Sequence, residues 1–221
     1  MNSFLRILAV LTASVPLALA HSVWVEPLSS GELVVRFAEP DGRLEKSPGH
    51  LDSLRLPLAW KVAGTNTPTA IVAEKKSDHF SLADTQSHQV VQIETAFAVL
   101  SAPNRPGRLP NFYARWHPDL RIAGRPGLTL DLVPTGEPGV VQAFFRGKPL
   151  PDIKATFRTP DEREVKLTAD AQGYLRFQST QPGLHHLSLA HHRETLPGFS
   201  GGLPYDLTSH NASLTWVAPN P

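Results

Sequence analysis

The sequence predicts an all-β protein built from two consecutive antiparallel β-sandwich domains. Three observations lead to this fold class. The 21 prolines and 15 glycines break the chain into short segments, which favours strands and turns over long helices. Between these breaks, apolar and polar residues alternate with the period of two that half-buried strands require. No window keeps the i, i+3, i+4 spacing of an amphipathic helix for more than about two turns.

The first twenty residues have the pattern of a secretory leader. Arg6 precedes an apolar stretch over residues 7–19, and Ala18-Leu19-Ala20 fits the small-x-small site of signal peptidase. The stretch is too short to span a bilayer as an ordinary transmembrane helix, and charges or prolines break every later hydrophobic stretch. We expect residues 1–20 to be a signal peptide, so that an exported mature chain without a transmembrane span begins at His21. A leader retained as an anchor is the alternative.

The first expected domain covers residues 21–120. Alternation and turn residues predict its strands at residues 33–37, 54–60, 69–73 and 89–93. One short helix is expected around residues 43–54. Alternation lapses over residues 116–127, where glycine and proline cluster, and this lapse places the domain boundary.

The second expected domain covers residues 121–221 and has clearer strand signals. Its strands are expected at residues 128–133, 140–145, 153–157, 165–168, 174–177, 184–191 and 212–217. About seven strands in about 95 residues, with a turn every ~8 to 12 residues, is typical of an immunoglobulin-like sandwich. The two halves are not similar enough to indicate a sequence repeat.

Composition excludes several kinds of site and partner. The chain has no cysteine, which removes disulfides, thiolate metal sites and cysteine nucleophiles together. Any metal ion must therefore be held by histidine, carboxylate, backbone or amine ligands, a set that suits nickel, copper, cobalt or zinc. One of the 21 basic residues is Arg6 of the leader, which has no acid, so the mature chain balances 20 basic against 20 acidic residues. A net charge of zero does not indicate binding to nucleic acid or to an anionic membrane.

The last two expected strands bring two histidines toward each other. If these strands pair around a loop at residues 194–209, the regular register is Leu187–Leu214, Leu189–Ala212 and His191–His210. Directly opposed side chains have Cβ atoms roughly 4.5 to 5.5 Å apart. We expect both imidazoles to meet where the apolar core gives way to a Gly-rich loop. The alternative is two half-exposed histidines at strand ends, one bonded to a loop carbonyl and the other to water.

His21 would carry a free α-amine after cleavage of the leader. The amine and Nδ1 of one residue can bind the same metal ion and close a chelate ring, which an internal histidine cannot do. One or two further imidazoles would complete a T-shaped or square-planar nitrogen set, which favours copper(II) or nickel(II). The alternative is that the leader merely ends at this point. We interpret the other histidines, among them His50 and His117, as solvated surface residues.

Six stretches together resemble a known group of proteins. They are AHSVWVEP at residues 20–27, RFAEPDGRLEKSPGHLD at 36–52, YARW at 113–116, FFRGKPLPDIKATF at 144–157, TADAQGYLRF at 168–177 and HHRETLPGFSGGLPYDLTSHNASLTW at 191–216. This set is similar to a largely uncharacterised family of secreted bacterial proteins, described as periplasmic components of nickel or cobalt uptake. The likeness covers nearly the whole mature chain, and its start and its terminal His…Gly…Tyr-Asp…His pattern are its more specific parts.

The resemblance implies two β domains, the second with a carboxypeptidase-regulatory-like topology, and a periplasmic location. It also implies a role in handling transition-metal ions. Carried over residue by residue, it points to His21, His191 and His210 as metal ligands.

We therefore expect a periplasmic protein that binds nickel, cobalt or copper through these three histidines and supplies an inner-membrane importer. The alternative is a metal-free structural or adhesive sandwich module that binds protein or envelope polysaccharide through an exposed apolar or aromatic patch, for which Phe112, Tyr113 and Trp116 are candidates. An enzyme is the third hypothesis and is not expected. Oxidative copper enzymes that cleave polysaccharides need aromatic residues around the metal, where this chain offers only Trp24, and no hydrolase motif is present.

Overall fold

The computed structural model describes residues 21–219 except 40–41, 65–66 and 179–180. The all-β prediction is confirmed: seventeen strands and one 3₁₀ helix, η1 (His50–Ser53), make up the described elements. The predicted signal peptide at residues 1–20 lies outside the described residues. Within the described part, no helix is long and apolar enough to cross a membrane.

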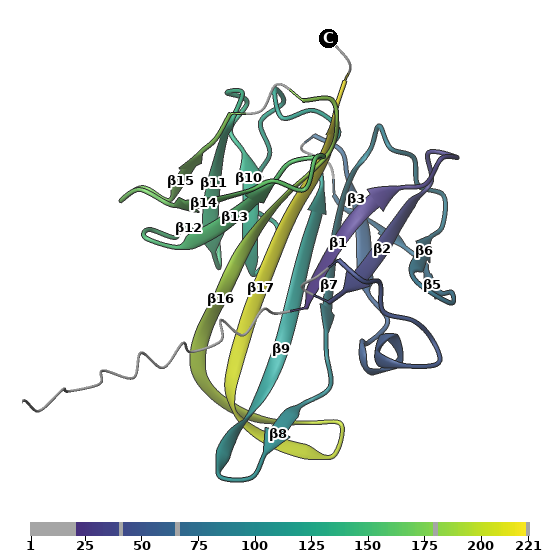
Figure 1. Ribbon diagram of the computed structural model, residues 1–221, viewed down its shortest axis with the longest axis vertical. Coiled ribbons are helices and arrows are strands. Elements are labelled where there is room, and N and C mark those ends of the chain that lie inside the picture. Colours follow the sequence, from purple (N-terminus) through teal and green to yellow (C-terminus); the bar gives the residue numbers. More distant parts are fainter. Residues whose placement is uncertain (1–20, 40–41, 65–66, 179–180, 220–221) are drawn as a thin grey trace, which may run out of the picture.

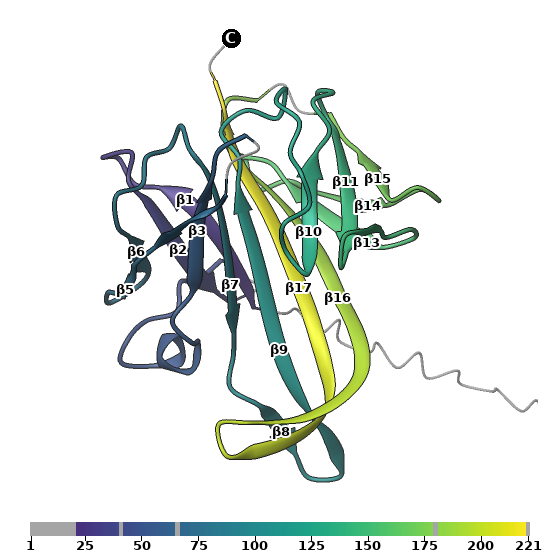
Figure 2. The same ribbon diagram turned by 180° about the vertical axis from the view of Figure 1, so that it is seen from behind.

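One long sheet runs through the centre of the molecule (Figures 1 and 2). Its order is β14 (Glu164–Thr168), β13 (Lys154–Arg158), β16 (Gly183–Ser200), β17 (Leu203–Ala218), β9 (Arg105–Trp116), β7 (Val90–Ala96), β3 (Leu58–Val62) and β4 (Thr69–Ile71), with β8 (Leu100–Ala102) beside β9. Strands from both halves of the sequence therefore share this sheet.

Two smaller sheets lie on either side of the long sheet, as Figure 1 shows. The first contains β1 (Ser22–Pro27), β2 (Leu33–Ala38), β6 (Phe80–Leu82) and β5 (Ala73–Lys75). The second contains β10 (Leu130–Pro134), β11 (Val140–Phe145), β12 (Lys148–Pro149) and β15 (Tyr174–Arg176). Each small sheet encloses a separate apolar core against the long sheet, which gives two sandwiches.

Alternation along β9 and β17 divides the side chains between the two cores. Phe112, Ala114 and Trp116 of β9 belong to the first core, whereas Leu214 and Trp216 of β17 belong to the second. This division follows from the period of two, which sends successive side chains to opposite faces of a sheet. The buried positions of Phe112, Tyr113 and Trp116, each exposed by 6% or less, show that the expected surface patch of these aromatics is wrong.

The two halves are joined by parallel pairing of β9 with β17, which runs from Arg108–Leu207 to Trp116–Thr215. This pair is an exception to the expected antiparallel arrangement. The expected division into residues 21–120 and 121–221 stays a prediction, because one sheet connects both cores. The immunoglobulin-like topology of the second half also stays a prediction.

Two local predictions are wrong. Residues 194–209 do not form a loop, because β16 continues to Ser200 and β17 begins at Leu203, so that the two strands form a long hairpin. The helix expected over residues 43–54 is limited to the single turn of η1. Backbone hydrogen bonds between β16 and β17 continue through the Gly-rich and Pro-containing segment, with a register shift between Thr195 and Gly198. From Leu207 onward, β17 also pairs with β9.

A buried ion pair crosses the junction between the halves. The Arg115 guanidinium donates to Asp131 through Nε at 3.0 Å and Nη2 at 2.6 Å, and both side chains are at most 1% exposed. Asp131 Oδ2 also accepts the backbone N–H groups of Gly127 and Leu128. One carboxylate thus holds β9, the 127–128 connection and β10 together.

Replacing Asp131 with Ala should therefore destabilise the protein strongly. The variant leaves a buried guanidinium without its counter-charge, which typically costs about 3 to 5 kcal/mol. Urea unfolding followed by tryptophan fluorescence measures the free energy of unfolding. Asp119→Ala is the matched control, because its partner Arg121 is 74% exposed and such pairs contribute about 1 kcal/mol or less. Equal losses in the two variants would contradict the assigned role of the buried pair.

Stability should also fall in mildly acidic solution because of His117. This residue is 2% exposed, its Nδ1 has no hydrogen-bond partner among the described residues, and burial, reinforced by Arg115, lowers its pKa from 6.5 to about 4. The unfolded chain therefore binds a proton more readily, so the contribution is complete above pH 6.5 and is lost as the pH falls toward 4.

The difference in pKa corresponds to roughly 3 kcal/mol at full protonation. Urea unfolding of the wild type and of His117→Gln across this pH range measures the effect, and the variant should show the shallower decline. Parallel declines in the two proteins would assign the pH dependence to other groups.

Candidate metal centre

The candidate site lies where β1 begins and β2 ends. His21 directly precedes β1, and its ring stacks on Phe37 of β2 with 4.9 Å between ring centroids and on Phe97 at 6.3 Å. Glu39 directly follows β2. Glu45 is held close to the same strand end, because its backbone N–H donates to the carbonyl of Phe37 at 2.8 Å.

His50 reaches the site from η1, and Asp52 fixes the turn that carries it. The Asp52 carboxylate accepts hydrogen bonds from Ser47 Oγ at 2.7 Å, the Gly49 N–H at 3.0 Å and Lys75 Nζ at 2.5 Å. These bonds, with that from Lys75 contributing most, lower the pKa of Asp52 to about 2. Gly49 has φ +149° and a Cβ there would lie 2.8 Å from the Lys46 carbonyl, so the turn requires glycine.

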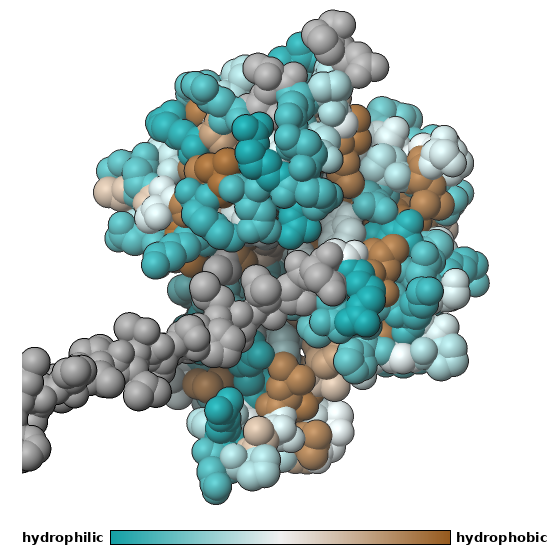
Figure 3. Space-filling model, in the orientation of Figure 1, coloured by the Kyte–Doolittle hydropathy of each residue, from teal (hydrophilic) through white to brown (hydrophobic). Residues whose placement is uncertain are grey.

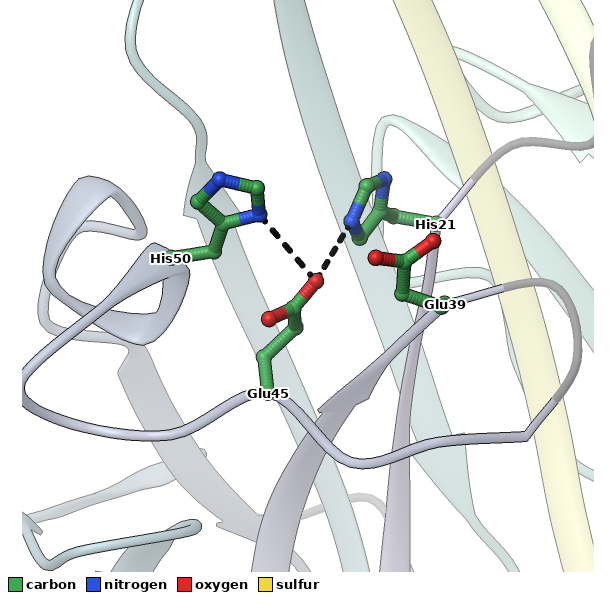
Figure 4. A group of neighbouring side chains, drawn as sticks. All are labelled: His21, Glu39, Glu45 and His50. Carbon is green, nitrogen blue, oxygen red and sulfur yellow. Dashed lines mark hydrogen bonds and ion pairs between the residues drawn. The ribbon is translucent and has the colours of Figure 1, made fainter.

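Four side chains converge at this point, as Figure 4 shows. His21 Nε2 lies 2.8 Å from Glu45 Oε1, and His50 Nδ1 lies 3.3 Å from the same oxygen. One ligand atom from each of His21, Glu39, Glu45 and His50 lies within 4.8 Å of the others. We call these four residues the His/Glu cluster.

The cluster offers two imidazole nitrogens and two carboxylate oxygens to one point. Divalent transition ions bind such ligands at about 2.0 to 2.2 Å, so ligand atoms around one ion lie up to about 4.4 Å apart. Small side-chain rotations would bring the four groups to that spacing. The Glu45 side chain is 13% exposed and that of His50 is 64% exposed, so the cluster opens to solvent on the His50 side.

The expected pairing of His191 with His210 is wrong. Leu187 does pair with Leu214 and Leu189 with Ala212, but the register then shifts and His192 is opposite His210. A β-bulge inserts one extra residue on one strand, and side chains beyond it exchange faces. His191 and His210 consequently lie on opposite faces of the long sheet.

Both ring nitrogens of His210 have hydrogen-bond partners, on the face of the long sheet that packs against the second core. Its Nδ1 shares a hydrogen bond with the Tyr113 hydroxyl at 2.9 Å, and its Nε2 shares one with Glu194 Oε2 at 3.0 Å. Burial lowers the pKa of His210, while Glu194 acts in the opposite direction. Neither nitrogen is free to bind a metal ion in this arrangement.

His191 shares a cleft of about 430 Å³ with His21 on the opposite face. The lining of this cleft includes Trp24, Glu39, Arg158 and His186. His191 Nδ1 has no hydrogen-bond partner among the described residues, and burial lowers the pKa of the ring. Of the three predicted ligands, therefore, the structure brings His21 and His191 to one cleft and separates His210 from both.

Three residues of the His/Glu cluster were not predicted as ligands. Glu39, Glu45 and His50 all lie in the stretch at residues 36–52, and His50 was interpreted as a surface histidine. An acid-rich loop that begins at a strand end and leads to a Gly-His step was the available signal. It was weak, because the spacing along the chain does not indicate that the loop folds back on His21.

Comparison with family models and curated sequences found no match to this chain. No protein-family model matches the chain, and no curated protein sequence matches it significantly. The resemblance described above therefore stays a prediction, and function has to be argued from the site.

Proposed function

We propose that the protein binds a divalent transition-metal ion in the periplasm and supplies it to an inner-membrane importer, with the His/Glu cluster as the metal site. The observation that carries this proposal is the convergence of two imidazoles and two carboxylates within 4.8 Å. His21 is common to this site and to the set expected from the sequence. The role is binding rather than catalysis.

The ligand types suit nickel(II) or cobalt(II) as the ion. Both accept mixed imidazole and carboxylate ligands, and neither needs the thiolate that this chain lacks. Copper(II) should bind more tightly to the isolated protein, because affinities for nitrogen and oxygen sites rise from cobalt through nickel to copper. Selection between these ions in the cell would therefore depend on their availability.

The orientation of His21 limits the role of the α-amine. The chelate expected from the sequence uses the amine and Nδ1 of this residue, whereas Nε2 is the atom that faces Glu45. An ion bound to Nε2 cannot close a chelate ring with the amine of the same residue. In the proposed site the imidazole of His21 is the ligand and the amine is not required.

The metal-free alternative is not carried forward. The aromatic residues suggested for its binding patch, Phe112, Tyr113 and Trp116, are buried. That hypothesis would therefore need a different exposed apolar surface.

Substitution of cluster residues should weaken metal binding. His50→Ala and Glu45→Gln each remove one ligand, and each should raise the dissociation constant for nickel at least about tenfold. Even residues that only hydrogen-bond to a metal ligand contribute about this much to affinity. Isothermal titration of the chain beginning at His21 measures the constant. The matched control is His88→Ala, which removes an exposed histidine outside the cluster. Unchanged affinity in both cluster variants would refute the site.

One extra glycine ahead of His21 tests the role of the amine separately. If Nε2 is the ligand, the extended chain should bind nickel within about twofold of the unextended one, a change far below the tenfold that 1.4 kcal/mol represents. Titration of both chains under the same conditions provides the comparison. A tenfold loss would instead assign the amine and Nδ1 to the metal.

A further inference from the structure

Four strands extend beyond the two sandwiches as a narrow arm. β16 and β17 turn at residues 200–203 and β8 and β9 turn at residues 102–105, and both views place the two turns at the lower end of the molecule (Figures 1 and 2). The arm has its own small core of Ala96, Val99 and Leu109, against which Tyr205 packs. We call residues 100–108 and 193–206 the arm tip.

Glycines allow close packing within the β16–β17 hairpin and between it and β9. A Cβ on Gly198 would overlap the Tyr205 hydroxyl, and a Cβ on Gly107 would lie 2.7 Å from the Pro204 carbonyl. Arg55, from the body of the protein, donates a hydrogen bond to Ser200 at the end of β16. The two hairpins of the arm tip therefore pack against each other and form one surface.

Large apolar side chains project from this surface into solvent. Phe199 is 71% exposed, Leu196 48%, Leu203 46% and Leu100 41%. Hydrophobic residues are visible at the lower end of the molecule in Figure 3. Several large apolar residues exposed together at the end of a projection are typical of an interaction surface.

The same part of the chain carries arginines that have no ion-pair partner in the part of the protein that the structure describes. Arg105, Arg108 and Arg193 lie within the arm tip and Arg55 contacts it, and none of the four forms an ion pair among the described residues. Arg193 is close enough to Arg108 to help burial lower its pKa. Of the two acids in the tip, Glu194 is bonded to Arg146 and His210. Asp206 is exposed.

We propose that the arm tip docks on an anionic phospholipid bilayer. Phe199 and Leu203, adjacent to the β16–β17 turn, would enter the boundary between headgroups and acyl chains, as exposed apolar side chains of peripheral proteins do. The arginines would bind lipid phosphates, for which the guanidinium group is well shaped, and would be attracted by the negative surface. The balanced charge of the whole chain conceals this local excess of positive charge.

The docking surface is separate from the His/Glu cluster, since none of the cluster residues belongs to the arm tip. Vesicle binding should therefore survive substitutions that abolish metal binding. The two proposals can fail independently, and a Glu45→Gln variant distinguishes their failures.

Vesicle co-sedimentation tests the proposal, with the chain that begins at His21 and so contains every described strand. Vesicles of phosphatidylglycerol and phosphatidylcholine in equal parts should bind the protein at least tenfold more tightly than phosphatidylcholine alone. Phe199→Ser with Leu203→Ser, and separately Arg105→Glu with Arg193→Glu, should each weaken binding at least tenfold. Ile122→Ser is the matched control, because Ile122 is 60% exposed and lies outside the arm tip.

A thermal melt of each variant shows whether it is folded, and these exposed positions should leave the melting temperature nearly unchanged. Two results would overturn the proposal: absence of binding to the anionic vesicles, which would leave a protein partner as the occupant, or equal binding by the folded tip variants and the wild type. Binding that added salt does not weaken would also contradict the role of the arginines.

Discussion

The parallel pairing of β9 with β17 determines the rest of the architecture. The paired residues are about a hundred positions apart in sequence, from Arg108 with Leu207 to Trp116 with Thr215. Because side chains alternate along both strands, this one register assigns each residue of the β9–β17 pair to one of the two cores. Once it is set, neither small sheet can cover both faces, and each encloses a separate core.

The β9–β17 pair also fixes the position of β1, and with it the position of the candidate metal centre. Ser213 Oγ donates to the carbonyl of Val23 at 2.7 Å, and Thr215 Oγ1 donates to that of Val25. These side chains alternate with the apolar residues of β17, so the face that turns away from the second core holds β1 through hydrogen bonds. With β1 fixed, His21 lies at its start against Phe37, within reach of Glu45.

Local signals in the sequence predicted most strands but not the long-range pairing. Residues 33–37 and 140–145 agree closely with β2 and β11, because alternation between turn residues is encoded within each segment. The strand β9 was not predicted, since Pro106, Gly107 and Pro110 interrupt its pattern. Its pairing partners supply the stability that its own composition does not indicate, and tertiary context of this kind is absent from a local pattern.

The candidate site shows the same division between local and long-range information. The register of Leu187 with Leu214 was predictable from spacing, but the bulge after Leu189 was not. A single additional residue exchanged the faces of the side chains that follow it, up to a second shift after Thr195, which replaced His191 by His192 opposite His210. His50 could not be assigned at all, because its approach to His21 depends on a loop anchored by Asp52.

His210 in the long sheet differs from the histidines of the His/Glu cluster in how readily it could bind a metal ion. Tyr113 and Glu194 occupy both nitrogens of His210, so a metal ion at that ring would have to break one buried and one partly buried hydrogen bond and leave their partners unsatisfied. In the His/Glu cluster, Nε2 of His21 and Nδ1 of His50 share one oxygen of Glu45. In the proposed site, an ion among them would replace these contacts with stronger ones to the same atoms. It would leave no buried group unpaired, since the cluster opens to solvent at His50. The proposed function therefore places the ion at the loop and not at the ring of His210.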